Sequence, residues 1–574
     1  MKLLLTSVVG PYGVDDEYGK KENKMELFHN QVTREQGIFS YRFNHRSQGL
    51  YFLAENIDVS TAVLDFPTFK RFKKELKKGY DYIGISFIVP NFKKAQKMAQ
   101  TIRELSPKSK IILGGHGVSI PDIESMIDHD SICKGEGVNF LRELFGEDIN
   151  TPIKHPLGYS SFNRQVMGAP WAPDSGILIT GLGCANKCRF CATSHFFGSY
   201  IPYLKTGQEI FDVCCRFEDE KDITEFGILD ENFLKTKDRA LELLDLMEKN
   251  HRHFTFSIFS SAETLKAIGD LDILVRLGVT FIWVGVESKK EVFAKNKGTD
   301  FNVLFKELQK RGISVLASLI LFLEDHDKKT IWEDVDFVTS LNPDYLQFAP
   351  LGPLPGTKLY SDYESQGKVL KEVPYASQHG QGKIWFKHDY FSRDESEDFL
   401  RLAFEIDYNR NGASILRAIK TAFNGYLYSE NHPDERIRER SEGFKQRLKL
   451  MRYFLTASTL FVQNRKSEIL LKEIKESFRR IFGRMNLPGV MASMIVVLFS
   501  IKEYLRYRTV GDVRTPKTSY RLFNESAGYS DRLAEPSKEA TTSSKVTYRW
   551  PEQPEPSAAA VNDSHQESPL KRVA

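Results

Sequence analysis

Three cysteines in an otherwise cysteine-poor chain are the residues best suited to chemistry. Cys184, Cys188 and Cys191 form a Cys-x3-Cys-x2-Cys array that follows a strand-like run, Gly176–Thr180. Thiolates are soft ligands that bind iron–sulfur clusters or zinc. Three of them on one loop can hold three corners of a cubane cluster and leave the fourth iron open. A structural zinc ion would need a fourth ligand, which His195 could supply, so the spacing alone leaves both possibilities open.

The composition describes a multidomain protein without strong charge. The 574 residues are 41% hydrophobic and 27% charged, and the net charge of +4 is too small to indicate a nucleic-acid partner. The six cysteines are few and partly clustered, which favours a reducing cytoplasm over a disulfide framework. The apolar start, Met1–Gly10, continues into Pro11–Gly13 without a clear cleavage site, so we expect a buried first strand rather than a signal peptide.

Residues 1–150 alternate between strand-like and helix-like runs, with strands expected at 2–9, 59–64, 82–87, 110–113 and 131–133. This alternation predicts a doubly wound parallel sheet, in which ligands bind beyond the carboxyl ends of the strands. The residues at those ends include Ser86, Gly114, Gly115, His116, Gly135 and Glu136. Glycine lets a ligand approach the backbone closely, so this edge is a candidate binding site. The long connection of residues 26–53 could line the same cavity or simply cover the sheet.

The alternation begins again after a linker at residues 151–175. Six strands are expected at 176–180, 225–229, 254–259, 280–284, 313–322 and 345–349. Six βα units predict a partial parallel barrel over residues 176–372, with its chemistry at the carboxyl ends of the strands. Three polar clusters fall at such ends, namely Asp230-Glu231-Asn232-Phe233, Gly285-Val286-Glu287-Ser288 and Pro355-Gly356-Thr357.

The cysteine array and the three clusters together resemble the radical S-adenosylmethionine (SAM) enzymes. The resemblance implies that Cys184, Cys188 and Cys191 hold a [4Fe–4S] cluster whose open iron binds SAM. The SAM contacts that it implies are Phe190, Asp230, Glu231, Gly285, Glu287, Ser288 and Pro355. An electron from a donor such as flavodoxin or ferredoxin would then cleave SAM, and the deoxyadenosyl radical would abstract hydrogen from an unactivated carbon. The chain departs from its relatives after the fifth strand, where Phe322–His326 replaces a common Gly-x-Pro turn.

The sheet of residues 1–150 resembles the cobalamin-binding domain found in one subgroup of these enzymes. The cobalamin contacts implied by this resemblance are Ser86, Gly114, Gly115, His116, Gly135 and Glu136. The Asp-x-His-x-x-Gly motif of mutase-type domains is replaced here by Leu64–Phe69, which has no histidine. The radical SAM subgroup commonly lacks this histidine too, although an empty domain would show the same sequence.

Residues 373–512 carry helical periodicity and predict a helical C-terminal domain that caps the substrate. Within it, the apolar segment Leu487–Ile501 is too short to span a bilayer. With Lys502, Arg506 and Arg508 behind it, the segment could dock on a membrane surface or form a buried helix. Residues 513–574 are rich in Pro, Ser, Glu and Ala and predict a disordered tail.

The sequence therefore predicts a cytoplasmic radical SAM enzyme with peripheral membrane contact. The reaction implied by the resemblance is cobalamin-dependent methylation of a hydrophobic, lipid-like substrate, by analogy with hopanoid methylases and archaeal tetraether-lipid ring-forming enzymes. One alternative is ring formation or desaturation without methyl transfer. Another, of a different class, is a non-catalytic zinc-binding scaffold. The sequence identifies no catalytic side chain and no particular substrate carbon.

Overall fold

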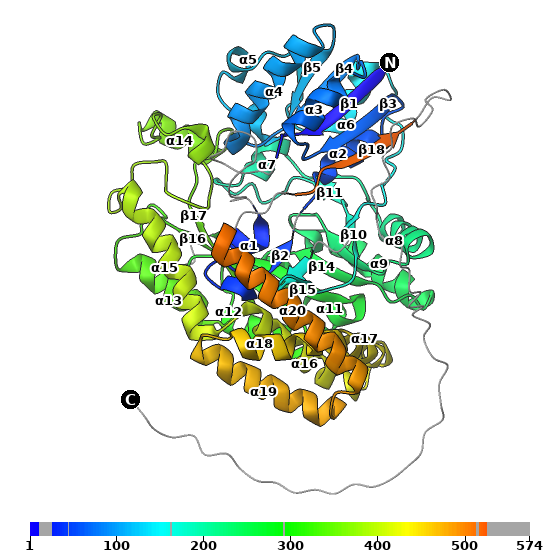
Figure 1. Cartoon of the computed structure of the whole chain (residues 1–574), viewed down its shortest axis with the longest axis vertical. Coiled ribbons are helices and arrows are strands. Elements are labelled where there is room, and N and C mark those ends of the chain that lie inside the picture. Colours follow the sequence, from blue (N-terminus) through cyan, green and yellow to red (C-terminus); the bar gives the residue numbers. More distant parts are fainter. Residues whose placement is uncertain (11–25, 44, 161–163, 291–292, 512–515, 525–574) are drawn as a thin grey trace, which may run out of the picture. The chain divides into compact units, whose positions relative to one another are not determined.

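Two largely parallel sheets and a set of C-terminal helices make up the computed structural model (Figure 1). It describes residues 1–10, 26–43, 45–160, 164–290, 293–511 and 516–524.

The first sheet has the strand order β18-β3-β1-β4-β5-β6. Its strands are β1 (Lys2–Ser7), β3 (Ser60–Asp65), β4 (Tyr82–Ser86), β5 (Lys110–Gly114), β6 (Ser131–Ile132) and β18 (Ser519–Phe523). The five strands predicted within residues 1–150 all pair in parallel, which confirms the doubly wound sheet. The strand order reverses between β1 and β4, and the crevice beyond the carboxyl ends of such a pair is where these sheets bind ligands.

Helices cover both faces of this sheet. They are α2 (Gln48–Glu55), α3 (Phe69–Leu76), α4 (Phe92–Leu105) and α6 (Gly137–Phe145). Alternation along β1 assigns the faces, because Leu4 belongs to one apolar core with α3 and α4 while Leu3 and Leu5 belong to another with α2 and α6.

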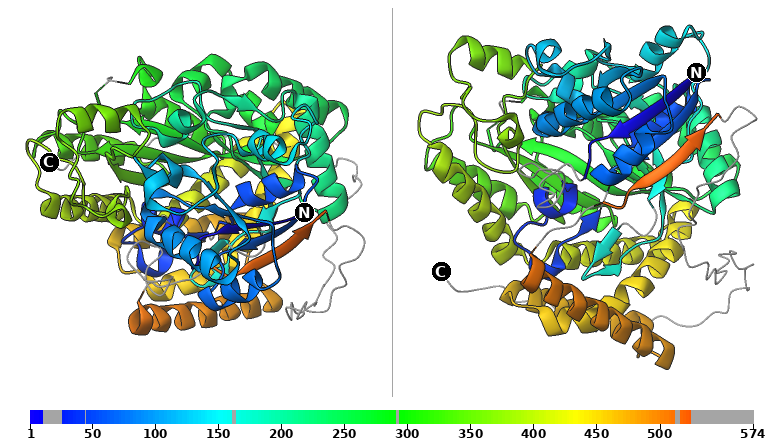
Figure 2. Two further views of the ribbon diagram at one scale, coloured as in Figure 1. Left: turned by 90° about the horizontal axis from the view of Figure 1, so that it is seen from above. Right: turned by 45° about the horizontal axis from the view of Figure 1, so that its top comes forward.

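Strand β18 comes from the region that the sequence predicts to be disordered. It pairs antiparallel with β3, with Tyr520 opposite Leu64, and lies along the edge of the sheet (Figure 2). The predicted tail of residues 513–574 is therefore wrong at Ser519–Phe523, because this short alternating segment gains backbone hydrogen bonds from a distant strand. Residues 513–515 and 525–574 of that prediction lie outside the described residues.

The second sheet has the order β17-β16-β15-β14-β13-β10-β7. Its strands are β7 (Tyr159–Ser160), β10 (Ser175–Leu178), β13 (Glu225–Ile228), β14 (Thr255–Phe259), β15 (Val279–Glu287), β16 (Ser314–Leu321) and β17 (Tyr345–Pro350). Six of these are parallel and adjacent in chain order, which confirms the partial barrel; β7 pairs antiparallel at one edge. The helices of this region are α8 (Gly207–Lys221), α9 (Lys237–Lys249), α10 (Ala262–Ile268), α11 (Asp272–Leu277), α12 (Phe301–Lys310), α13 (Thr330–Ser340) and α14 (Lys358–Ser365).

The segment of residues 26–43 packs with the barrel rather than with the first sheet. It contains α1 (Leu27–Gln31), η1 (Gly37–Phe39) and β2 (Arg42–Phe43). The Phe28 ring lies 6.3 Å from Phe281 and 6.2 Å from Tyr345, and Gln347 Nε2 donates to Gln31 Oε1 at 3.1 Å. The predicted domain of residues 1–150 is thus interrupted by a segment that closes one side of the barrel.

The C-terminal region is helical, as predicted. Its helices are α15 (Arg393–Asn411), α16 (Ser414–Glu430), α17 (Glu435–Met451), α18 (Leu455–Phe461), α19 (Arg465–Phe482) and α20 (Leu487–Val510). Helices α16 and α17 contact residues that come just before barrel strands: Thr421 Oγ1 donates to Asp344 at 2.6 Å, and Arg440 donates to the Phe254 carbonyl at 2.8 Å. These two helices therefore lie at the amino end of the barrel, opposite the cysteines. The beginning of the predicted cap reaches the carboxyl end instead, where Trp385 Nε1 donates to the Pro353 carbonyl at 3.2 Å.

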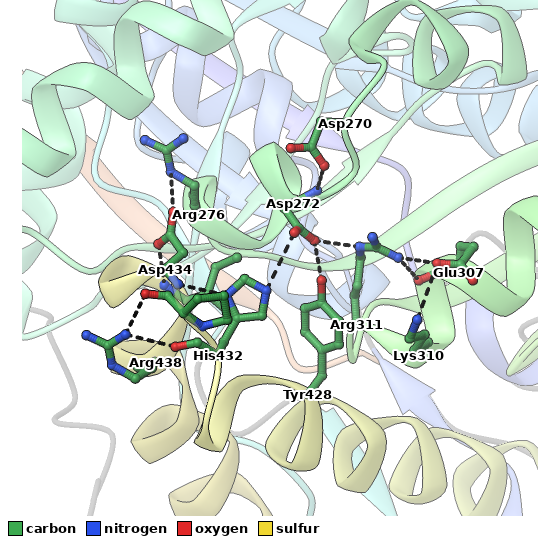
Figure 3. A network of polar contacts seen from close by, with 12 residues as sticks. Asp270, Asp272, Arg276, Glu307, Lys310, Arg311, Tyr428, His432, Asp434 and Arg438 are labelled. Atoms are coloured by element: carbon green, nitrogen blue, oxygen red, sulfur yellow. Dashed lines mark hydrogen bonds and ion pairs between the residues drawn. The ribbon is translucent and has the colours of Figure 1, made fainter.

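A polar network joins these helices to the barrel (Figure 3). Asp272 of α11 accepts hydrogen bonds from Arg311 Nε at 2.7 Å and from the Tyr428 hydroxyl of α16 at 2.6 Å. Arg276 and Asp434 form a longer ion pair at 3.8 Å in the same network. Because the network lies at the amino end of the barrel, we assign it to stability rather than to the site.

Helix α20 is longer than the apolar run suggested. Residues Leu487–Thr509 have the length and composition of a helix that could cross a membrane, which corrects the expectation that this segment is too short. Core helices of soluble proteins meet the same criterion, so length and composition alone do not assign the helix to a bilayer.

Candidate active site

The three cysteines lie on the loop between β11 (Gly181–Leu182) and α7 (Ala192–Phe197). Left-handed backbone at Gly183, with φ of 76°, and at Lys187, with φ of 44°, curls this loop. All three thiols are partly exposed. Burial raises the pKa of Cys184 and of Cys188, and the neighbouring charge of Cys191 adds to the increase in both. Thiols that repel one another as anions are suited to a shared cationic centre.

The described residues form no ready-made site for a single metal ion. Within the described residues, no group of three or more His, Cys, Asp or Glu side chains is close enough to share one metal ion. Structural zinc requires four ligands at roughly 2.0–2.3 Å from one point. A cubane cluster instead separates its protein ligands across its corners.

Arg189, between two of the cysteines, is clamped by acidic residues from other parts of the barrel. Its Nη atoms donate to both oxygens of Glu324 at 2.8 and 3.0 Å, and its Nε donates to Asp362 at 2.9 Å. Its carbonyl also accepts from the Leu359 amide at 3.0 Å. Glu324 belongs to the segment that replaces the Gly-x-Pro turn of relatives. The departure noted in the sequence thus ties the cysteine loop to the ends of β16 and α14, a role that sequence reasoning missed.

Asp230 is fully engaged inside the protein. It forms an ion pair with Arg239 at 2.8 Å, in which each side chain is only 2% exposed. It also accepts hydrogen bonds from Thr180 Oγ1 at 2.9 Å, from the Tyr200 hydroxyl at 2.7 Å and from the Asn232 amide at 3.1 Å. With four donors on its two oxygens, Asp230 orders the loop and offers no free carboxylate, which argues against the predicted SAM contact.

The neighbours of Asp230 are better placed for a ligand. Glu231 is exposed, and its charge contributes to raising the pKa of Cys184, so it lies on the cysteine side of the loop. Asn232 joins two strand ends, because its Oδ1 accepts from the Ser261 amide at 3.1 Å. Phe190 is partly buried, and its ring packs edge-on against Phe293 with centroids 5.9 Å apart.

Glu287 already has a cationic partner. It adopts left-handed backbone with φ of 65°, its side chain is 9% exposed, and it pairs with Lys295 Nζ at 2.5 Å. Burial disfavours the charged amine, but Glu287 holds the pKa of Lys295 above its usual value. Gly285 leaves room for this pair, because an added Cβ would clash with Glu287 Oε1 and lie 2.8 Å from Lys295 Nζ. Lys295 also interacts electrostatically with Cys188 and Cys191. Sequence reasoning missed Lys295, because a single lysine eight residues after Glu287 belongs to no recognisable motif.

The remaining predicted SAM residues shape the turns. Ser288 is buried, and its Oγ accepts from the Lys290 amide at 3.1 Å. Pro355 is buried, and the next residue, Gly356, has left-handed backbone with φ of 86°. Ser119 of η3 (His116–Ser119), which follows β5 of the first sheet, packs against Gly356 and would lie 2.9 Å from a Cβ added there. This turn brings the end of β17 against the carboxyl edge of the first sheet.

The predicted cobalamin residues meet the cysteine loop at that edge. The His116 ring lies 4.5 Å from Phe196 of α7, and burial lowers its pKa to about 4, so the imidazole is neutral. Gly115 has φ of 82°, and the space of its missing side chain is taken by the Phe87 carbonyl, 2.6 Å from an added Cβ. Glu136 caps α6 by accepting from the Val138 and Asn139 amides. Gly115 and Glu136 therefore have structural roles, although all six predicted residues of this edge are partly exposed.

The barrel interior contains aromatic residues that the sequence reasoning did not single out. Phe259 and Trp283 stack with centroids 5.1 Å apart, and Trp283 Nε1 donates to Ser318 Oγ at 3.1 Å. Both rings are only partly buried. Alternation along β15 could have found Trp283, because it points to the same side of the strand as Gly285, two residues later. The Glu287 carboxylate lies on that side too, where it would clash with a Cβ added at Gly285.

Residues 178–338 match the model of the radical SAM superfamily. This chain contains a radical SAM domain. Members of this superfamily use S-adenosylmethionine with a [4Fe–4S] cluster, so the chain is an enzyme with these cofactors, and the zinc-scaffold interpretation is set aside.

Three individual proteins are similar to this chain. Bacteriochlorophyllide d C-8(2)-methyltransferase of Chlorobaculum tepidum is 26% identical over 325 residues, 51% of this chain and 70% of that protein. An uncharacterized methyltransferase of Pyrococcus horikoshii is 21% identical over 405 residues, 63% of this chain and 87% of that protein. Among solved structures, the radical S-adenosylmethionine methyltransferase TsrM from Kitasatospora setae, with cobalamin and a [4Fe–4S] cluster bound, has 15% identity and a TM-score of 0.49, covering 79% of this chain and 99% of that chain.

Proposed function

We propose that this protein is a cobalamin-dependent radical SAM methyltransferase that acts on a hydrophobic, lipid-like substrate. The observation that carries the proposal is the meeting of two strand-end sites: His116 of the first sheet contacts Phe196 beside the cysteine loop, and Ser119 contacts Gly356. A ligand at the edge of the first sheet would therefore share one space with SAM. When bound, cobalamin would supply the methyl group, and the cluster with SAM would supply the radical.

The chain's own residues would hold and orient these groups. Cys184, Cys188 and Cys191 would provide the three thiolates of the cluster. Glu287 offers the buried carboxylate best suited to the cationic part of SAM, and Lys295 is its partner within the chain. Ser86, Gly114 and Gly135 are among the partly exposed residues of this edge that could face cobalamin.

A hydrophobic substrate is supported by the aromatic interior of the barrel. Phe259 and Trp283 present partly exposed rings on the same side of the sheet as Glu287. The relatives' names support methyl transfer, and one of them names a bacteriochlorophyllide as its substrate. The proposal includes a cytoplasmic protein with peripheral membrane contact and a flavodoxin- or ferredoxin-type electron donor.

The decisive experiment compares extracted lipids and pigments from cells with and without the gene. Complementation with the wild-type gene should restore a product heavier by one CH2 group. Cys188→Ser should fail to restore it, while Cys215→Ser, a partly buried cysteine on α8, should restore it fully. A product lighter by two hydrogens would instead indicate ring formation or desaturation and would refute methyl transfer.

Two measurements on purified protein test the cofactors separately. Anaerobic reconstitution should yield roughly four irons per chain. Gel filtration after incubation with hydroxocobalamin should show retained corrin. Loss of the corrin with iron retained would remove the methyl-transfer proposal and leave the radical SAM assignment intact.

A further inference from the structure

Helix α20 buries its small residues and exposes its large apolar ones. The buried positions are Gly489, Ser493, Val496, Val497 and Ser500. The exposed apolar positions are Leu487, Val490, Met491, Met494, Ile495, Leu498, Phe499 and Ile501. Leu487 is 74% exposed and Leu498 is 65% exposed. An ordinary surface helix places its large apolar residues on the protein core, so this helix presents the opposite pattern.

The buried side of α20 is fixed to the protein. Ser493 Oγ donates to the Tyr453 carbonyl of η7 (Arg452–Phe454) at 3.1 Å and lies 2.6 Å from Thr456 Oγ1 of α18. In the left view of Figure 2 the helix lies along the margin of the molecule. The apolar side spans about 22 Å along the axis at 1.5 Å per residue. Exposed apolar surfaces of this kind mark contact with a protein or a membrane.

Cations stand at both ends of this apolar side. Residues 479–511 contain six cations and one acid, Glu503, which pairs with Arg506 at 2.9 Å. The other cations are Arg479, Arg480 and Arg484 before the apolar side, and Lys502 and Arg508 after it. None of these five forms an ion pair with another residue in the part of the chain that the structure describes. Unpaired cations beside an exposed apolar side complement a layer of anionic headgroups.

We infer that α20 is a docking helix that lies in the plane of an anionic lipid bilayer, with Leu487–Ile501 in the acyl boundary and the flanking cations among the headgroups. Two copies of the chain paired through α20 would bring these cations together, which disfavours a dimer. Ser493 and its partners fix the helix against the protein, which disfavours insertion across the bilayer. This inference deepens the proposed function and rests on it only for the hydrophobic substrate that a membrane would supply.

The test is co-sedimentation of the full-length protein with lipid vesicles, without SAM. Binding is expected with vesicles of phosphatidylcholine and phosphatidylserine, weaker with phosphatidylcholine alone, and weaker at high salt. Replacing Met491 and Leu498 together by Asn should reduce the partition constant about tenfold or more, because two large apolar side chains leave the acyl region. Val303→Asn is the matched control, because Val303 is 56% exposed on α12, and it should change nothing.

Three outcomes would overturn the inference. The first is that the wild-type protein does not bind vesicles, or that the Met491/Leu498 variant and the Val303 control lose vesicle binding to the same extent. The second is a concentration-dependent dimer that the Met491/Leu498 variant disperses, which would assign the surface to a second copy. The third is membrane association that survives an alkaline carbonate wash, which would indicate insertion. Vesicle binding is measured without cofactors, so its result is independent of the methyl-transfer proposal. Absence of vesicle binding would refute the docking helix alone, and absence of a methylated product would refute methyl transfer alone.

Discussion

Replacing Asp230 by Ala separates a structural role from a ligand-binding role. The substitution leaves Arg239 buried without its acidic partner, although the Tyr200 hydroxyl at 2.8 Å and the Leu204 carbonyl at 3.0 Å still contact its other nitrogen. Breaking a buried pair from one side costs about 3–5 kcal/mol. Because two contacts to Arg239 remain, we expect Asp230→Ala to lower the free energy of unfolding by about 3–4 kcal/mol. For a barrel-sized unit that corresponds to a fall in melting temperature of roughly 6–16 °C.

The assay is thermal unfolding followed by circular dichroism, with SAM binding by calorimetry on folded, cluster-loaded protein. Glu231→Gln is the matched control, because Glu231 is adjacent but exposed, and its effect on stability should stay within about 0.5 kcal/mol. Combining Asp230→Asn with Arg239→Met removes both charges and should recover most of the lost stability. An Asp230→Ala protein with unchanged melting temperature and lost SAM affinity would refute this reasoning and restore the sequence-based prediction of a SAM contact.

Two further predictions concern the cysteine loop and the strand before it. Arg189→Met removes the clamp that orients this loop and should lower the apparent cluster affinity about tenfold or more, measured as iron retained after gel filtration. Arg216→Met on α8 is its control, and equal iron retention in both variants would contradict the clamp. His155 Nε2 accepts from the Ile179 amide at 2.9 Å, and burial lowers the pKa of His155 to about 4. The unfolded chain binds this proton near pH 6.5, so stability should fall as the pH drops below 6.5, by about 2 kcal/mol at pH 5. His155→Gln should lose that part of the slope in urea unfolding, and an unchanged slope would contradict the assignment.

Local patterns in the sequence were sufficient to predict both sheets. Strand alternation located the strands of the first sheet and of the barrel, because a buried parallel strand needs only a short apolar run between turns. The Cys184–Cys191 spacing likewise predicts a metal-binding loop, because three thiolate ligands are already close in the chain, and the resemblance to radical SAM enzymes implies that they hold a cluster. The pattern failed at Ser519–Phe523, because an edge strand needs a partner that lies more than 400 residues away in sequence.

The site required more than local pattern. Asp230 and Glu231 are adjacent acids after one strand, and only packing shows that Asp230 is enclosed by Arg239 while Glu231 stays exposed. Side-chain burial depends on what the rest of the chain brings alongside, which no spacing encodes. The same holds for Lys295, which is identified only by its position against Glu287.

By itself, therefore, the sequence determined the βα order and the cysteine loop, because strand periodicity and ligand spacing are properties of short segments. The radical SAM chemistry followed from the resemblance of its motifs to that family. Only the tertiary structure decided that Glu324 and Asp362 clamp Arg189, since these partners lie 135 and 173 residues away. It also placed α16 and α17 at the amino end of the barrel and turned the apolar side of α20 outward. Apolar composition makes a helix prone to burial, but the packing of small residues such as Ser493 decides which side is covered.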